Sequence, residues 1–225
     1  MSRPPGRRLA PRRAAPLALF RLVRPHLVLL AAVALLASAC ATSPGPAGGA
    51  DALPRPSREV FGNGMRLIIQ EHRAADIVAV HLWVGVGVRY EPPDSLGYSH
   101  FMEHMLFKGT DKWGPGHIDR AVEGVGGRSN AVTSFDYTNF YIVVPSEGME
   151  EAIQLLSDMA FRSTFDPEEI RREREVIFEE ARIEQDNPRS AIIRQLYGMV
   201  FAGHPYGRPV LGTRETMLAA PTTRC

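Results

Sequence analysis

The chain has 225 residues, with 26 basic and 25 acidic side chains and a formal net charge of +1 at neutral pH. Because this near-neutral chain has no basic cluster beyond its first 25 residues, its charge does not suggest a nucleic-acid partner. The presence of only two cysteines, Cys40 and Cys225, excludes a fold held by a disulfide scaffold.

The first 40 residues have the pattern of a bacterial signal peptide. Residues 1–25 carry many arginines and no acidic side chain, and residues 27–39 are apolar but too few to span a membrane. Residues 36–40 resemble a lipobox, although the leucine stands one place earlier than is commonest. We therefore expect Cys40 to be lipidated and the protein to be anchored to a membrane in the periplasm of the bacterial cell envelope. Cleavage after Ala39 by an ordinary signal peptidase and a retained short anchor are the alternatives.

The rest of the chain divides into a linker, residues 41–57, and a folded part, residues 58–218. The linker is rich in Pro, Gly, Ala and Ser, which predicts a flexible tether. Within the folded part, the patterns predict strands over residues 65–71, 77–90 and 137–144 and helices over residues 148–161 and 190–201, besides two helices described next. This order of elements predicts an α+β domain, a mainly antiparallel sheet covered by helices.

A buried helix is predicted around the pentapeptide His100-Phe101-Met102-Glu103-His104. Asp94 or Ser95 could cap its start, and Gly109 stands where a C′ glycine ends a helix. Two histidines four residues apart share one helix face and can hold one metal ion, and Glu103 between them could activate a metal-bound water. Ordinary core histidines are the alternative, but three polar groups on one buried helix need a common partner.

A second helix is predicted from Asp166-Pro167 to Asn187-Pro188, with Asp166 as its N-cap. One face of this helix is a broad apolar arc formed by Ile170, Val176, Ile177, Ala181 and Ile183. Glu173 and Glu180 fall within this arc, whereas Glu179 lies among charged residues. A carboxylate on a buried face needs a partner, so Glu180 is our candidate for the third metal ligand. We expect Glu173, two turns earlier, to hydrogen-bond a ligand or the substrate, or alternatively to pair with a nearby arginine.

Four segments of this chain resemble the M16 metallopeptidases, a family that includes pitrilysin, insulin-degrading enzyme and the β-subunit of the mitochondrial processing peptidase. These segments, which lie in family order within residues 58–218, are HFMEHMLFKGT, GGRSNAVTSFDYTNFYIVV, EEIRREREVIFEEARIEQDNP and HPYGRPVLGT. The resemblance implies a single M16-type (LuxS/MPP-like) metallohydrolase domain. It also implies one Zn²⁺ ion bound by His100, His104 and Glu180, with Glu103 as general base and Glu173 in support of catalysis.

The resemblance further implies how a peptide would bind and be cut. Residues 129–134 are similar to the family's edge strand, which holds an extended peptide by main-chain pairing, so we assign Asn130 and Ala131 to substrate contact. A turn after Gly126-Gly127 that enters a strand is a compatible, purely structural interpretation. Zinc would lower the pKa of its bound water, and Glu103 would take the proton and pass it to the leaving amine.

Several alternatives remain open at the level of the sequence. A zinc endopeptidase is the favoured function, ahead of a non-catalytic M16-like binding or scaffold subunit and of a structural domain with zinc enclosed by four protein ligands. Iron or manganese would also fit two histidines and a carboxylate, whereas we expect His117 and His204 not to bind metal.

Family members usually carry a second homologous domain. We therefore expect a second M16 domain or subunit as partner, and we interpret the atypical tail, residues 219–225, as a sign of a truncated or frameshifted reading frame.

Overall fold

A computed structural model describes residues 54–221 of the chain. The chain divides into two compact units, Met1–His72 and Arg73–Cys225. The predicted signal peptide, the lipidation site Cys40 and most of the linker lie outside the described residues, as do residues 222–225 of the tail.

The described part of the first unit is a two-stranded hairpin. Strand β1 (Ser57–Val60) pairs antiparallel with β2 (Arg66–Ile69), with Ser57 opposite Ile69. Gly64 in the connecting turn has a φ of 86°, a left-handed conformation that glycine adopts without strain. Strand β2 lies within the predicted range 65–71, whereas β1 was not predicted.

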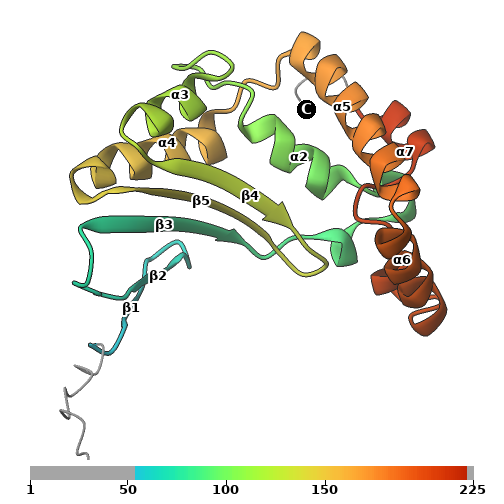
Figure 1. The fold of residues 1–225 in the computed structure, drawn as a ribbon, viewed down its shortest axis with the longest axis horizontal. Coiled ribbons are helices and arrows are strands. Elements are labelled where there is room, and N and C mark those ends of the chain that lie inside the picture. The colour runs from blue at the N-terminus through green and yellow to red at the C-terminus, as the bar shows by residue number, and fades with distance from the viewer. Residues whose placement is uncertain (1–53, 222–225) are drawn as a thin grey trace, which may run out of the picture. The chain divides into compact units, whose positions relative to one another are not determined.

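The second unit is built on a three-stranded antiparallel sheet in the order β3-β5-β4 (Figure 1). Its strands are β3 (Ile77–Val84), β4 (Arg128–Thr133) and β5 (Thr138–Pro145). The prediction of a strand over residues 77–90 was too long, because the chain leaves the sheet after Val84 and forms a 3₁₀ turn at Val88–Tyr90. A Cβ on Gly87 would lie 2.3 Å from the carbonyl oxygen of Ser134, so only glycine permits this close approach.

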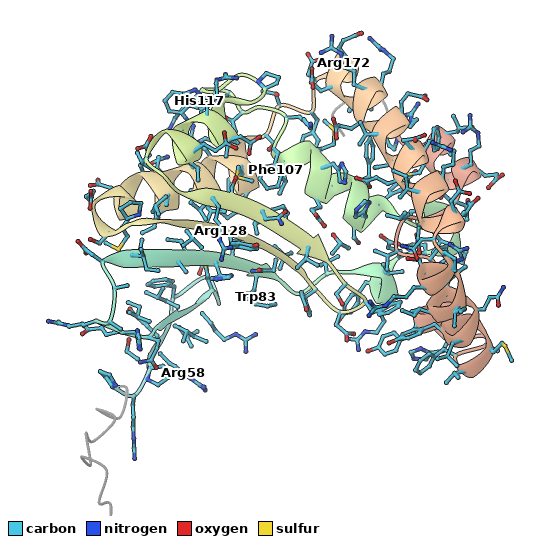
Figure 2. All side chains as sticks on the ribbon, viewed as in Figure 1. Arg58, Trp83, Phe107, His117, Arg128 and Arg172 are labelled. Carbon is cyan, nitrogen blue, oxygen red and sulfur yellow. The ribbon has the colours of Figure 1, made fainter. Side chains whose placement is uncertain are left out.

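Helices cover one face of this sheet. Helices α3 (His117–Gly124) and α4 (Met149–Arg162) lie along this face, and α2 (Tyr98–Leu106) lies beside them (Figure 1). Buried residues of these helices and of the central strand form the main core: Leu106, Ile118, Val122, Phe140, Ile142, Val144, Ala152, Leu155, Leu156 and Met159. Phe107, which directly follows α2, packs against this core (Figure 2).

The other helices form a second group at one end of the sheet (Figure 1). They are α5 (Pro167–Asp186), α6 (Pro188–Val200) and α7 (Arg214–Ala219). Asp166 caps α5 by accepting from the amides of Glu168 and Glu169, which confirms the predicted start. The predicted ranges 148–161 and 190–201 match α4 and α6 within two residues, whereas α3 and α7 were not predicted.

The start of α2 was predicted wrongly. Its N-cap is Gly97, with φ 87°, whereas Asp94 and Ser95 belong to a preceding 3₁₀ turn. The buried carboxylate of Glu91 accepts from the amides of Gly97 and Ser99 at 2.8 and 2.6 Å, and so satisfies donors that a local cap would take. At the other end, Gly109 has φ 115° but lies two residues beyond the C-cap Phe107.

The observed architecture confirms the predicted class, an α+β fold with an antiparallel sheet covered by helices. Among residues 54–221, no helix combines the length and the apolar character needed to cross a bilayer.

The contact between Gly97 and Gly212 provides a test of how α2 is fixed. A Cβ on Gly97 would lie 2.7 Å from Cα of Gly212, and φ is positive at both positions. We therefore expect Gly97→Ala to lower the free energy of unfolding by about 2 kcal/mol or more, from backbone strain and the clash together. The matched control is Gly124→Ala in α3, where a Cβ would meet no atom within 4 Å. Urea titrations of both variants measure the difference, and equal stabilities would contradict the role given to this contact.

Candidate metal centre

Two histidines of α2 face α5 from successive helical turns. The imidazole rings of His100 and His104 lie 4.6 Å apart between centroids, and their side chains are only 13% and 16% exposed. Phe101 and Met105, on the adjacent stripe of α2, are buried in a second core with residues of α5, of α7 and of the C-cap of α7: Ile170, Ile177, Met217 and Ala220. The apolar packing thus holds both imidazoles against α5.

The structure brings the third predicted ligand, Glu180 of α5, to the same place. Its Oε2 lies 3.9 Å from Nε2 of His100 and 3.6 Å from Nε2 of His104. One ligand atom from each of the three residues lies within 4.8 Å of the others. Ligand atoms about 2.0–2.1 Å from a tetrahedral zinc are about 3.4 Å apart, so the donor set and its spacing fit the metal. Glu180 is 40% exposed, which leaves the centre open on one side.

Glu173 contacts one of these ligands from behind. Its side chain is 6% exposed, and its Oε2 accepts from Nδ1 of His104 at 3.0 Å. The cation that pairs with Glu173 is Lys108, whose Nζ lies 2.7 Å from Oε1. The alternative, an ion pair between Glu173 and an arginine, was therefore wrong, because the paired cation is a lysine. In contrast to Nδ1 of His104, Nδ1 of His100 is buried without a hydrogen-bond partner among the described residues.

Glu103 lies beside the histidines and is held by β4. The hydroxyl of Thr133, the last residue of β4, donates to Oε2 of Glu103 at 2.5 Å. Burial raises the pKa of Glu103 above its usual range, and the hydrogen bond from Thr133 opposes that rise. This carboxyl therefore stands next to the candidate ligands with one oxygen fixed by a neutral donor.

The same side chains line an open pocket of about 420 Å³ that reaches the edge of the sheet. Besides the histidines and the three glutamates, it is lined by Phe107, Lys108, Asp119, Ser129 and Asn130. Asn130 is exposed on the edge strand β4, and its side-chain oxygen accepts from the amide of Ala131 at 2.9 Å. Ala131 itself is partly buried against the main core. The structure thus places Asn130 in the pocket and Ala131 directly beside it in β4.

Burial and the neighbouring His104 lower the pKa of His100 from 6.5 to about 4. An imidazole with so low a pKa is neutral at physiological pH, the state in which it can ligate a metal.

The two histidines that were expected not to bind metal do not line the metal pocket. His117 stacks on Trp113 at 4.2 Å, and Nδ1 of His204 accepts from the amide of Tyr206.

Sequence reasoning missed the two residues that pair with or hydrogen-bond glutamates of the site, Lys108 and Thr133. Lys108 lies four residues after His104, a spacing that predicts a shared helix face and could have indicated a common partner. Thr133 follows Ala131 by two residues in the strand, so its side chain lies on the same face, toward the core, and this orientation was foreseeable. The contact between Thr133 and Glu103 depends on how β4 packs against α2, for which the sequence carries no local signal.

Comparison with protein families and known sequences gives a consistent result. A model of the family described as insulinase (peptidase family M16) matches residues 66–214. The chain is 38% identical over 155 residues to YmxG of Bacillus subtilis (strain 168), which is described as an uncharacterized zinc protease. That match covers 69% of this chain and 38% of the relative, so the chain spans well under half of the relative's length.

Solved structures of proteases share the fold. A protease from Helicobacter pylori has a TM-score of 0.71 and 26% identity, over 75% of this chain and 41% of that one. The periplasmic protease PqqL from Escherichia coli has a TM-score of 0.69 and 27% identity, over 76% of this chain and 20% of that one.

The low pKa of His100 predicts a pH dependence of stability for the metal-free chain. Below pH 6.5 the unfolded chain binds a proton at this residue that the folded chain does not bind until about pH 4. Folding stability should therefore fall as the pH is lowered through this window, by about 2–3 kcal/mol at pH 4.5, since each pKa unit corresponds to about 1.4 kcal/mol.

Urea titrations at pH 7.5 and pH 4.5 measure this loss. In the variant His100→Gln, most of this difference in the free energy of unfolding between the two pH values should disappear. The variant His117→Gln, at the half-buried stacked histidine, should retain the difference. An unchanged pH dependence in His100→Gln would show that another group causes the loss.

Proposed function

The chain belongs to the insulinase family of peptidases, peptidase family M16, and we propose that it is a zinc-dependent endopeptidase domain that hydrolyses peptide bonds of unfolded or extended peptides. Membership of the family confirms the resemblance seen in its motifs. The observation that carries the proposal is the convergence of His100, His104 and Glu180 within 4.8 Å, with Glu103 in the same pocket.

Each residue has a distinct part in the proposed reaction. His100, His104 and Glu180 would hold one zinc ion, which would act as a Lewis acid and lower the pKa of a water in the pocket. Glu103 would accept the proton of this water as it attacks the peptide carbonyl, and would then donate it to the leaving amine. A carboxyl whose pKa is raised by burial suits both tasks, because its two protonation states are closer in free energy near neutral pH.

The geometry of β4 supports an extended substrate. This strand pairs with β5 on one side only, so its outer edge is open within the described part of the chain. A peptide added along this edge would pair with main-chain groups next to Glu103, and flexible or unfolded chains adopt such a conformation most easily. The amide of Ala131 now donates to the side chain of Asn130, and a peptide carbonyl would take the place of that side chain.

We further propose that full activity needs a second M16 domain, supplied by another chain or by further polypeptide. The chain covers 41% and 20% of the two similar protease structures, which supports a partner domain around the substrate. We also propose a periplasmic location, which the similarity to the periplasmic protease PqqL supports, with attachment to the membrane through Cys40.

Replacement of Glu103 by glutamine tests the reaction. Because the amide cannot accept the proton, we expect Glu103→Gln to lower the rate of peptide cleavage by about 10²-fold or more while zinc stays bound. Cleavage of a quenched fluorescent, unstructured peptide measures the rate, and metal analysis measures the zinc content. The chain is assayed alone and with an added family domain.

The matched control is Glu179→Gln, which removes the same charge one residue from Glu180 on the exposed face where Glu179 pairs with Arg182. It should leave both zinc content and rate unchanged. Zinc binding without activity under any condition would favour the scaffold or structural interpretation, whereas a wild-type chain without zinc would overturn the ligand assignment.

The lipidation of Cys40 is tested separately, in bacterial cells that express the full chain. The wild-type chain should incorporate labelled fatty acid and fractionate with membranes. The variant Cys40→Ala should lose both properties, while Cys225→Ala, which removes the other cysteine, should retain them. Absence of label from the wild type, together with a free periplasmic chain, would indicate cleavage by an ordinary signal peptidase.

A further inference from the structure

Glu173 is the most buried carboxylate of the pocket, and both of its oxygens have a partner. Oε2 accepts from Nδ1 of His104 at 3.0 Å, and Oε1 pairs with Nζ of Lys108 at 2.7 Å. A carboxylate accepts hydrogen bonds only, so Nδ1 of this imidazole carries a proton, and the neutral tautomer that this contact selects has its lone pair on Nε2. The lone pair of Nε2 is what a metal would use.

The backbone just beyond α2 brings Lys108 to this carboxylate. The amide of Lys108 donates to the carbonyl of Met105, so the chain makes one further tight turn after the helix. Lys108 thereby follows His104 by about one turn and reaches the same carboxylate from the other side. The side chain of Lys108 is 31% exposed, whereas that of Glu173 is 6% exposed. The ammonium therefore lies between the buried carboxylate and the solvent of the pocket.

We propose that Lys108 is a positioning residue for the metal centre. It neutralises the charge of Glu173 and fixes Oε1, so that Oε2 stays directed at Nδ1 of His104 and the imidazole keeps Nε2 turned toward Glu180. Partners that orient a metal-ligating histidine in this way typically change metal affinity 10–100-fold when they are removed. The inference rests on the proposed function, because it takes His104 to be a zinc ligand.

Direct electrostatics predicts the opposite effect on zinc. An ammonium beside the pocket repels a divalent cation, so its removal should tighten zinc binding if charge alone matters. If Lys108 acts by holding Glu173, its removal should weaken zinc binding. The sign of the change therefore separates the two effects.

The experiment is a zinc titration of the full chain against a chromophoric chelator, without any assay of activity. We expect Lys108→Met to bind zinc about tenfold more weakly than the wild type. Lys108→Arg, which keeps the charge and can donate to Oε1, should restore most of the affinity. Should the methionine variant not fold, Lys108→Gln is measured in its place, with the same expected sign.

The chain offers a matched control in Lys112, which pairs with another buried carboxylate. Nζ of Lys112 lies 3.2 Å from Asp158, whose side chain is 1% exposed, and Lys112 does not line the metal pocket. Lys112→Met removes the same charge from a similar pair and should leave zinc affinity unchanged. A loss of affinity equal to that of Lys108→Met would show a general effect of stability and would overturn the proposal.

A double variant tests whether Lys108 acts through Glu173. Glu173→Gln should weaken zinc binding, and adding Lys108→Met to it should cause no further loss. A further loss, or a Lys108→Met single variant that binds zinc as tightly as the wild type or more tightly, would overturn the inference while the proposed function stands. A wild-type chain that binds no zinc would overturn the proposed function itself.

Discussion

The whole site depends on the packing of α2 against α5. The buried apolar side chains at this contact recur at helical spacing on each helix: Phe101, Met105, Ile170 and Ile177. Each contributes about 1.5–3 kcal/mol when buried, which offsets the desolvation of the carboxylate that the contact also buries. His104 contacts Glu173 at 3.0 Å and lies 3.6 Å from Glu180, whereas His100 approaches Glu180 alone, at 3.9 Å. The later turn of α2 therefore lies nearer to the start of α5. A shift of either helix by one turn, about 5.4 Å, would break the contact between His104 and Glu173.

The parts of this arrangement that were predicted are those with local causes. The start of α5 follows from Asp166 and Pro167, which cap and begin a helix whatever surrounds it. The facing of Glu173 and Glu180 follows from their seven-residue separation, which is close to two turns. The start of α2 was not predictable in this way, because its cap is the distant carboxylate of Glu91, and such a contact forms only when the tertiary structure brings the segments together.

The apolar arc predicted for α5 shows the same limit. Ile170 and Ile177 are buried as expected, but Val176 and Ile183 are 42% and 58% exposed. Periodicity indicates which side chains share a face, yet it does not indicate how much of that face a neighbour covers. The strand that carries Thr133 was predicted from the resemblance and from the turn signal at Gly126-Gly127, but the hydrogen bond from Thr133 to Glu103 could not be derived from spacing within either element.

The carboxylates of the pocket differ in their partners, and this difference argues for their separate roles. Glu173 is paired on both oxygens by Lys108 and His104, so neither oxygen is free to bind a metal. Glu103 accepts from Thr133 through one oxygen, which leaves the other available for a proton. Glu180 has no lysine or arginine partner among the described residues and approaches only the two imidazoles, and its side chain is 40% exposed, against 6% for Glu173. Environment thus separates chemically identical side chains, and it leaves Glu180 as the carboxylate best able to complete a metal site with the two histidines.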